Sequence, residues 1–240
     1  MPMTDDAGLS EQARLKREAW ARRQGVESYV REMGPYAVER DARIIRAMLG
    51  RGPGRLLDMP CGTGRYLELE KELGYEVVAA DYSPTMLSVA TRHPDVRFVR
   101  ADVFAPPFDP GSFDVILISR LLFHYAESER ILGALLPCLK AGGRMVFDVL
   151  NAFSTRWMAS RALGCLRTDP AKRLYFETFA SMRRRLGRLG LRILDRRCAY
   201  VAPTRLYRYL PRWATGALDA LEKAVPPSLR VLSFYNVTRA

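Results

Sequence analysis

Three aspartates, Asp58, Asp81 and Asp102, each follow a short apolar run of the kind that forms a buried strand. Asp58 also precedes a turn that contains Gly62 and Gly64, and the residues after this turn predict a helix. Such a turn directs backbone N–H groups toward a ligand beyond the strand, and glycine lets that ligand approach closely. Because parallel strands end at one edge of a sheet, we expect the three carboxylates to lie together there.

Charge and spacing distinguish two kinds of ligand for this turn. A dinucleotide-binding turn has glycines spaced GxGxxG, but Leu67 occupies the third position. A carboxylate at Asp58 would repel a pyrophosphate, whereas it would attract the ammonium and sulfonium groups of S-adenosyl-L-methionine. The sequence therefore predicts S-adenosyl-L-methionine as the cofactor.

The other two aspartates suit the nucleoside part of the same cofactor. Asp81 is placed to accept hydrogen bonds from ribose hydroxyls, although an aspartate just before Ser83 is also typical of a helix N-cap. Asp102 is placed to accept a hydrogen bond from the adenine amino group, while the N–H of Val103 donates to the ring.

The surrounding pattern supplies the elements that would position these acids. Strands alternate with helices, and the strands are nearly continuous in apolar residues, which is typical of a parallel sheet covered on both faces. We predict an α/β, doubly wound, Rossmann-like fold. Its strands are expected at 55–59, 76–80, 97–100, 113–119 and 144–150, and its helices at 65–73, 83–91 and 128–139.

The two ends of the chain are expected to add to this core. Residues 1–50 predict N-terminal helices, 176–189 a further helix, and 191–201 and 230–238 two strands. The segments 152–175 and 203–229 suit a helical cap or insertion. We interpret 1–240 as one domain.

The stretch 55–151 resembles the class I S-adenosylmethionine-dependent methyltransferases, especially those acting on small molecules. The motifs that carry the resemblance are LLDMPCGTGR, AADYSPTML, ADVFAPPFDPGSFDVILIS, LLFHY and LPCLKAGGRMVFDV. The resemblance implies a seven-stranded, mostly parallel sheet whose final hairpin, here 191–201 with 230–238, is reversed. Pro60 departs from the family, which usually has glycine there.

The resemblance also extends the cofactor site. It implies that Met86 packs on the adenine, although a methionine there is more often plain core, and that Ser119 and Arg120 line the methionine end. The complete predicted cofactor-binding set is Asp58, Pro60, Cys61, Gly62, Gly64, Arg65, Asp81, Tyr82, Met86, Asp102, Val103, Ser119 and Arg120.

Two adjacent residues, His124 and Tyr125, are the candidates for catalysis. They follow the fourth predicted strand, where substrates of the resembled family meet the methyl group. A general base is needed only for an acceptor that arrives protonated, such as a phenol or alcohol, and the usual pKa of histidine suits that task. The alternative is that His124 merely packs against the cofactor. Predicted acceptor-binding residues are Tyr29, Tyr36, Asn151 and Trp157.

The predicted acceptor is a small hydrophobic metabolite, such as a natural product, quinone or lipid-like molecule, methylated on oxygen or carbon. Ser119-Arg120-Leu121-Leu122 stands where enzymes that methylate nucleobase amines carry an Asp/Asn-Pro-Pro-aromatic motif, so nucleic acid is not the expected partner. A basic RNA-binding or RNA-modifying protein is nevertheless the alternative, because the net charge of +12 attracts anions. Arginines encoded freely on solvated faces would give the same charge.

The segment 203–225 interleaves aromatic residues with arginines at positions 205, 208 and 212. Such a segment could rest on an anionic membrane surface or stack on single-stranded RNA. The third interpretation is an ordinary amphipathic helix packed on the sheet with a solvated basic face.

Composition points to a cytoplasmic protein. No apolar run approaches the roughly 20 residues that span a bilayer, and the first residues lack the apolar core of a secretory signal. The four cysteines are scattered, so reduced thiols are expected. The sequence has no metal-binding motif, and it does not specify an oligomeric state.

Overall fold

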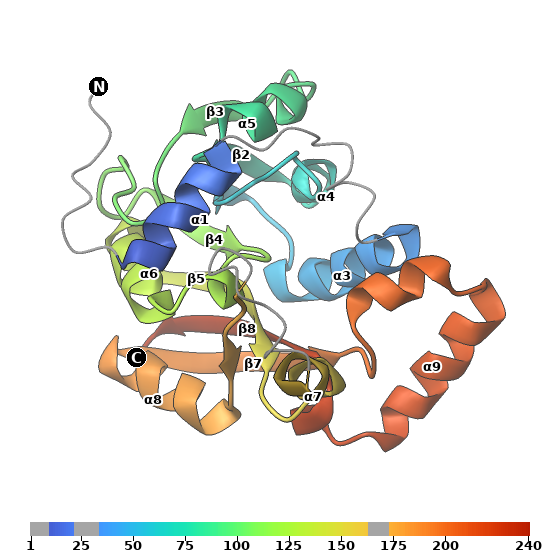
Figure 1. The fold of residues 1–240 in the computed structure, drawn as a ribbon. Helices are drawn as coiled ribbons and strands as arrows, with labels where there is room; N and C mark the ends of the chain where they lie inside the picture. The colour runs from blue at the N-terminus through green and yellow to red at the C-terminus, as the bar shows by residue number, and fades with distance from the viewer. Residues whose placement is uncertain (1–9, 22–33, 163–172) are drawn as a thin grey trace.

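The computed structural model describes residues 10–21, 34–162 and 173–240, which form a central sheet with helices on both faces (Figure 1). The strand order is β3-β2-β1-β4-β5-β8-β7, with a short β6 pairing with β5. The strands are β1 Gly54–Asp58, β2 Tyr75–Asp81, β3 Arg97–Arg100, β4 Phe113–Ile118, β5 Leu139–Asn151, β6 Phe176–Glu177, β7 Leu191–Ala199 and β8 Leu232–Arg239.

The first five strands pair in parallel, whereas β8 runs antiparallel to both β5 and β7. The predicted doubly wound sheet with a reversed final hairpin is therefore confirmed. Strand β6 was not expected, because 176–189 predicts a helix throughout. Helix α8 (Phe179–Arg188) begins later because Thr178 caps it, its Oγ1 accepting a hydrogen bond from the N–H of Ser181 at 3.0 Å.

Alternate strand residues build the two halves of the core. Leu56 and Val77 face one apolar cluster, which includes residues of α3 (Gly34–Leu49), α4 (Leu67–Glu72) and α5 (Pro84–Ala90). Their neighbours Leu57 and Val78 face the other cluster, which includes residues of α6 (Ser128–Leu135) and α8. Continuously apolar strands are thus required because both faces of the sheet are covered.

The predicted helix at 128–139 ends sooner than expected. Helix α6 stops at Leu135, a 3₁₀ turn η2 (Leu136–Cys138) follows around Pro137, and β5 already begins at Leu139. Proline cannot donate the backbone hydrogen bond that would continue the helix. The strand therefore includes Gly142 and Gly143, which lie between the helix predicted at 128–139 and the strand predicted at 144–150.

The remaining elements lie around this core. They are α1 (Glu11–Ala21), η1 (Leu122–His124), α7 (Thr155–Ala162), η5 (Thr204–Tyr209), α9 (Arg212–Ala224) and η6 (Pro227–Leu229). Figure 1 shows α9 at the periphery of the molecule, beside α3. Within the described ranges, no helix combines the length and the apolar character needed to cross a bilayer.

Candidate functional site

A cavity of about 950 Å³, its open mouth included, lies at the carboxyl ends of the central parallel strands. This is the edge where open α/β sheets bind ligands. All of the predicted cofactor-binding residues except Gly64 line it, and so do His124 and Tyr125. The structure therefore brings Asp58, Asp81 and Asp102 together in one cavity, as their positions at successive strand ends predicted.

The two glycines of the turn after β1 have different tasks. Gly62 has a φ of 56° and Gly64 a φ of 81°, values that favour glycine. A Cβ on Gly62 would meet open space beside the cavity, so its absence leaves room there. A Cβ on Gly64 would lie 2.8 Å from Leu67 Cδ1. Gly64 therefore permits close packing of the turn on α4 and does not line the cavity, contrary to its predicted place in the cofactor set.

Asp81 ties this turn to the end of β2. Its Oδ2 accepts a hydrogen bond from the N–H of Gly62 at 2.9 Å, and its Oδ1 accepts one from the N–H of Ser83 at 2.8 Å. The N-cap of α5 is Ser83, whose Oγ accepts from the N–H of Met86. Asp81 thus is not the helix cap that its sequence context left open, and its carboxylate stands at the cavity wall.

Asp102, for which a contact with adenine is predicted, lies just beyond β3 and lines the cavity. Its Oδ1 accepts a hydrogen bond from the N–H of Phe104 at 3.0 Å, which fixes the carboxylate at the cavity wall. Val103 is buried beside it and also lines the cavity.

Asp58 is the most unusual group of the site. It ends β1, is 1% exposed, and neither of its carboxylate oxygens has a hydrogen-bond partner among the residues described. Burial, reinforced by the negative charge of Asp81, raises the pKa of Asp58 well above its usual range. A cationic group in the cavity would supply the missing partner, so the ammonium of S-adenosyl-L-methionine fits this wall.

Sequence reasoning missed Glu70, which lies on α4 behind the turn. Its side chain is fully buried, and neither of its carboxylate oxygens has a hydrogen-bond partner within the described part of the chain. Burial and the negative charge of Asp58 raise its pKa well above the usual range. The run of acids in α4 gave no sign of this, since Glu68 and Glu72 on the same helix are exposed.

We expect Glu70→Gln to raise the free energy of unfolding by about 1–2 kcal/mol at pH 8, because an ionised carboxyl group without a partner is costly to bury. The raised pKa means that Glu70 favours folding most below about pH 4.5, its unfolded value, and that this contribution is lost as the pH rises. The gain should therefore shrink between pH 8 and pH 5. Urea unfolding at both pH values measures it.

The matched control for that experiment is Glu72→Gln on the same helix. Glu72 is exposed and pairs with Arg46, so its replacement should change stability by less than about 0.5 kcal/mol. Two results would contradict the assignment of Glu70 as a buried unpartnered acid. One is an equal change in the free energy of unfolding for both substitutions, and the other is a stability gain of Glu70→Gln that increases as the pH falls.

Arg120 connects the cavity wall to α3, a structural role that its sequence context did not indicate. Its N–H donates to Asp148 Oδ1 at 2.6 Å, its Nε lies 3.7 Å from Asp148 Oδ2, and its guanidinium donates to Asp41 on α3. Tyr200 donates its hydroxyl to the other oxygen of Asp41 at 2.7 Å. Although Arg120 lines the cavity as predicted, its charge is already neutralised by two buried carboxylates.

The two candidate catalytic residues lie at the same end of β4. His124 is partly exposed at the end of η1, with its ring against Phe123, and Tyr125 packs edge-on against Phe104 at 5.4 Å between centroids. The ammonium of Lys16 on α1 donates to the backbone carbonyl of His124. This contact ties α1 to η1 and holds the backbone that carries the histidine.

Several aromatic and apolar residues complete the cavity wall beyond the predicted set. They are Met59, Tyr66, Ala101, Phe104 and Leu121. Their sequence context is that of ordinary core residues. Only their position around the turn and η1 shows that their side chains face the cavity. They make the wall suitable for flat or apolar groups.

The predicted acceptor-binding residues lie elsewhere in the structure. Tyr36 stacks on Tyr207 at 5.5 Å, Trp157 packs against Phe153 on the α7 segment, and none of the described residues of 152–162 or 173–229 lines the cavity. Tyr29 lies outside the described residues.

Asn151, the fourth predicted acceptor residue, has a structural role in the sheet. Its Nδ2 donates to the carbonyl of Arg230 at 2.6 Å and its Oδ1 accepts from Ser233 at 2.7 Å, which ties β5 to β8. Tyr36, Asn151 and Trp157 are therefore separated from this cavity, and their contact with an acceptor rests on sequence alone.

Comparison with known proteins agrees with this architecture. A family model described as methyltransferase domain matches residues 57–147, and the sheet has the fold of a class I S-adenosylmethionine-dependent methyltransferase. The chain contains such a domain, whose methyl donor is S-adenosyl-L-methionine.

Two groups of relatives share this part of the sequence. A demethylmenaquinone methyltransferase from Thermus thermophilus is 40% identical over 111 residues, which is 43% of this chain and 50% of the relative. A ubiquinone biosynthesis O-methyltransferase from Bradyrhizobium sp. is 30% identical over 128 residues, which is 52% of this chain and 49% of the relative. The chain thus spans about half the length of the curated relatives it matches.

Two solved structures share the fold over nearly the whole chain. A possible histamine N-methyltransferase from Thermotoga maritima superposes with a TM-score of 0.70 at 15% identity, covering 94% of this chain and all of that one. Magnesium protoporphyrin IX methyltransferase from Synechocystis, solved with bound SAH, has a TM-score of 0.67 at 14% identity, with 95% and 100% covered. At such low identity these likenesses concern the fold alone.

Proposed function

We propose that this protein transfers a methyl group from S-adenosyl-L-methionine to oxygen or carbon of a small, hydroxylated, hydrophobic ring compound of the quinol class. The observation that carries the proposal is the buried, unpartnered carboxylate of Asp58 in a cavity that also gathers Asp81, Asp102 and His124. The names of the demethylmenaquinone and ubiquinone methyltransferases similar to this chain support the quinol class.

The residues around the cavity would divide the work as follows. Asp58 would hold the cofactor's ammonium, Asp81 its ribose and Asp102 its adenine, while the Gly62 turn leaves room for close approach. When bound, the cofactor supplies a methyl group already activated by positively charged sulfur. The remaining task of the protein is to align the acceptor and exclude water.

The acceptor side is formed by aromatic and apolar residues near η1. Phe104, Leu121 and Tyr125 line the cavity beside His124, so a flat hydrophobic ring would find suitable contacts there. For methylation on oxygen, His124 would take the hydroxyl proton and leave the O–H electron pair on oxygen. The new oxygen–carbon bond would form as the carbon–sulfur bond of the donor breaks, with the electron pair of that bond going to sulfur.

The direct test is transfer of labelled methyl from S-adenosyl-L-methionine to a reduced naphthoquinol or benzoquinol, with the product identified by its mass. Appearance of a methylated quinol supports the proposal. Label found in RNA while every hydroxylated ring compound remains unmodified would refute it and favour the RNA-modifying alternative.

We expect His124→Ala to lower kcat for such an acceptor about a hundredfold, because a positioned general base contributes roughly 10²–10⁴-fold. The Kd for the cofactor, measured by calorimetry, should stay within about threefold. The control is His93→Ala, the other histidine, whose Nδ1 lies 3.5 Å from Glu68 Oε2, away from the cavity. An unchanged kcat in His124→Ala would remove the histidine from the proton transfer.

A further inference from the structure

Helix α9 exposes several apolar side chains to solvent, although Leu218 on its inward side packs against the core. Its acidic residues Asp219 and Glu222 point inward, while the exposed side carries Trp213 and Leu221 together with the exposed alanines at 217, 220 and 224. These positions share one face, because they recur at the spacing of about 3.6 residues per turn. The exposed side of α9 is therefore mostly apolar, whereas the amphipathic-helix interpretation of 203–225 expected a solvated basic face.

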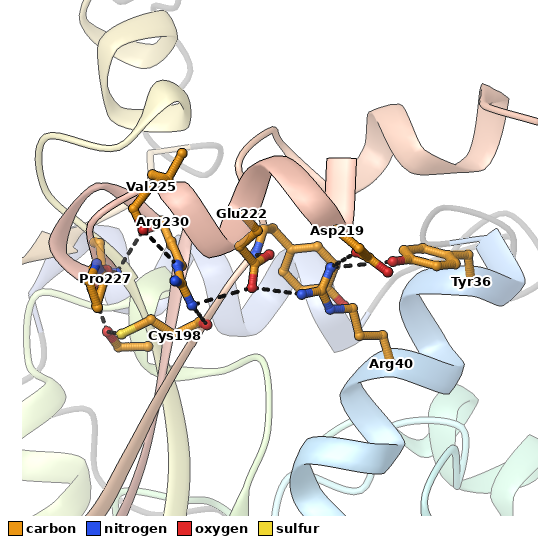
Figure 2. A network of polar contacts seen from close by, with 11 residues as sticks. Tyr36, Arg40, Cys198, Asp219, Glu222, Val225, Pro227 and Arg230 are labelled. Atoms are coloured by element: carbon orange, nitrogen blue, oxygen red, sulfur yellow. Dashed lines mark hydrogen bonds and ion pairs between the residues drawn. The ribbon is translucent and has the colours of Figure 1, made fainter. Parts of the chain in front are cut away.

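Figure 2 shows what holds the helix in this orientation. Arg40 on α3 pairs with Asp219, and its second guanidinium nitrogen lies 2.7 Å from Glu222 Oε1. Arg230 approaches the same Glu222 oxygen at 3.5 Å and donates to the carbonyls of Val225 and Cys198. Both acids of α9 are thus neutralised on its inner side.

The exposed side chains of η5 and α9 are partly apolar and partly basic. Tyr209 is 71% exposed and Trp213 is 78% exposed, while Leu206 and Leu221 are about half exposed at 50% and 52%. Arg205, Arg208 and Lys223 are exposed on the same two elements, and the guanidinium of Arg208 lies 4.5 Å from the centre of the Tyr209 ring. We call this surface, formed by η5 and α9, the η5–α9 face.

We propose that the η5–α9 face is a docking surface for an anionic lipid bilayer. Trp and Tyr favour the membrane–water boundary, leucine and alanine would enter the acyl boundary, and exposed arginine and lysine would contact anionic headgroups. The net charge of +12 adds to this attraction. The proposal does not depend on the acceptor proposed above.

Two other occupants fit the same face less well. A second copy of this chain would bring two sets of basic side chains and two charges of +12 together, which opposes association. Single-stranded RNA would use the arginines and aromatic rings for stacking, but it would leave Leu206, Leu221 and the alanines without an apolar partner. A bilayer accommodates all three kinds of side chain.

The test is co-sedimentation of the full chain with vesicles of phosphatidylcholine containing about one third phosphatidylglycerol. We expect binding that weakens with salt, because the headgroup attraction is screened. The variants Trp213→Glu and Leu221→Glu should each reduce partitioning about tenfold or more. The matched control is Leu194→Glu on β7, an equally exposed leucine (47%) outside the face, which should bind like the wild type.

Three results would overturn the proposal. The first is a wild-type protein that stays in the supernatant with anionic vesicles. The second is an equal loss of binding in Leu194→Glu and Leu221→Glu, with each variant shown to be folded by its cofactor affinity. The third is a Trp213→Glu variant that keeps vesicle binding but loses a dimer in light scattering or loses RNA affinity, which would assign the face to a second copy or to RNA.

Discussion

Asp81→Ala is expected to raise the Kd for S-adenosyl-L-methionine about a thousandfold. Asp81 stands at the cavity wall and is placed to accept two hydrogen bonds from ribose hydroxyls, and hydrogen bonds to a charged group contribute about 1.5–3 kcal/mol each. About 1.4 kcal/mol corresponds to a factor of ten in affinity. The same change removes the hydrogen bond that fixes the Gly62 N–H. Isothermal titration calorimetry measures the Kd directly.

The pH dependence provides a second readout for the same residue. Burial raises the pKa of Asp81 to about 6, although hydrogen bonds from Ser83 and Gly62 oppose the shift. The carboxylate is therefore ionised above about pH 6, and affinity for the cofactor should fall as the pH drops through that value. The Asp81→Ala protein should lack this particular transition.

The control for Asp81→Ala is Asp95→Ala, because Asp95 is exposed and pairs only with Lys71 among the described side chains. Its affinity should match that of the wild type. An Asp81→Ala Kd within threefold of the wild type would contradict both the ribose assignment and the interpretation of the cavity as the cofactor site.

The second large effect concerns stability. Arg120→Met should lower the free energy of unfolding by about 3–5 kcal/mol, because it leaves Asp41 and Asp148 buried without their cation. Burial already raises the pKa of Asp148 to about 6, and Arg120 opposes that shift. Methionine has a similar volume. Because neither residue is glycine, the substitution leaves the conformational cost of the left-handed backbone at this position, where φ is 59°, about the same. Urea denaturation gives the value.

Exposed ion pairs contribute far less than buried ones, which supplies the comparison. Arg46 pairs with Glu72 at the surface, both about half exposed, and Arg46→Met should cost less than about 1 kcal/mol. Adding Asp41→Asn to Arg120→Met should restore part of the lost stability, since it removes one of the orphaned charges. A loss below 1 kcal/mol for Arg120→Met would show that the buried cluster does not stabilise the fold.

The sequence by itself determined the sheet and the position of three aspartates at one cavity wall. Alternating strands and helices predicted the doubly wound fold, and the reversed hairpin came from a family resemblance. Asp58, Asp81 and Asp102 could be placed together because each ends a parallel strand, and the ends of parallel strands share one edge. These inferences succeed because strand ends and glycine turns are fixed by short stretches of sequence.

Only the tertiary structure decided which side chains meet across the chain. Three findings depend on how residues distant in sequence are placed. They are the contact of Arg120 with Asp41, the burial of Glu70 behind Asp58, and the position of Tyr36 and Asn151 outside the cavity. The orientation of α9 is decided in the same way. Arg40 and Arg230, from other elements, hold its acids inward, and this places Trp213 and Leu221 at the surface. No periodicity within the helix indicates which face a distant cation will select.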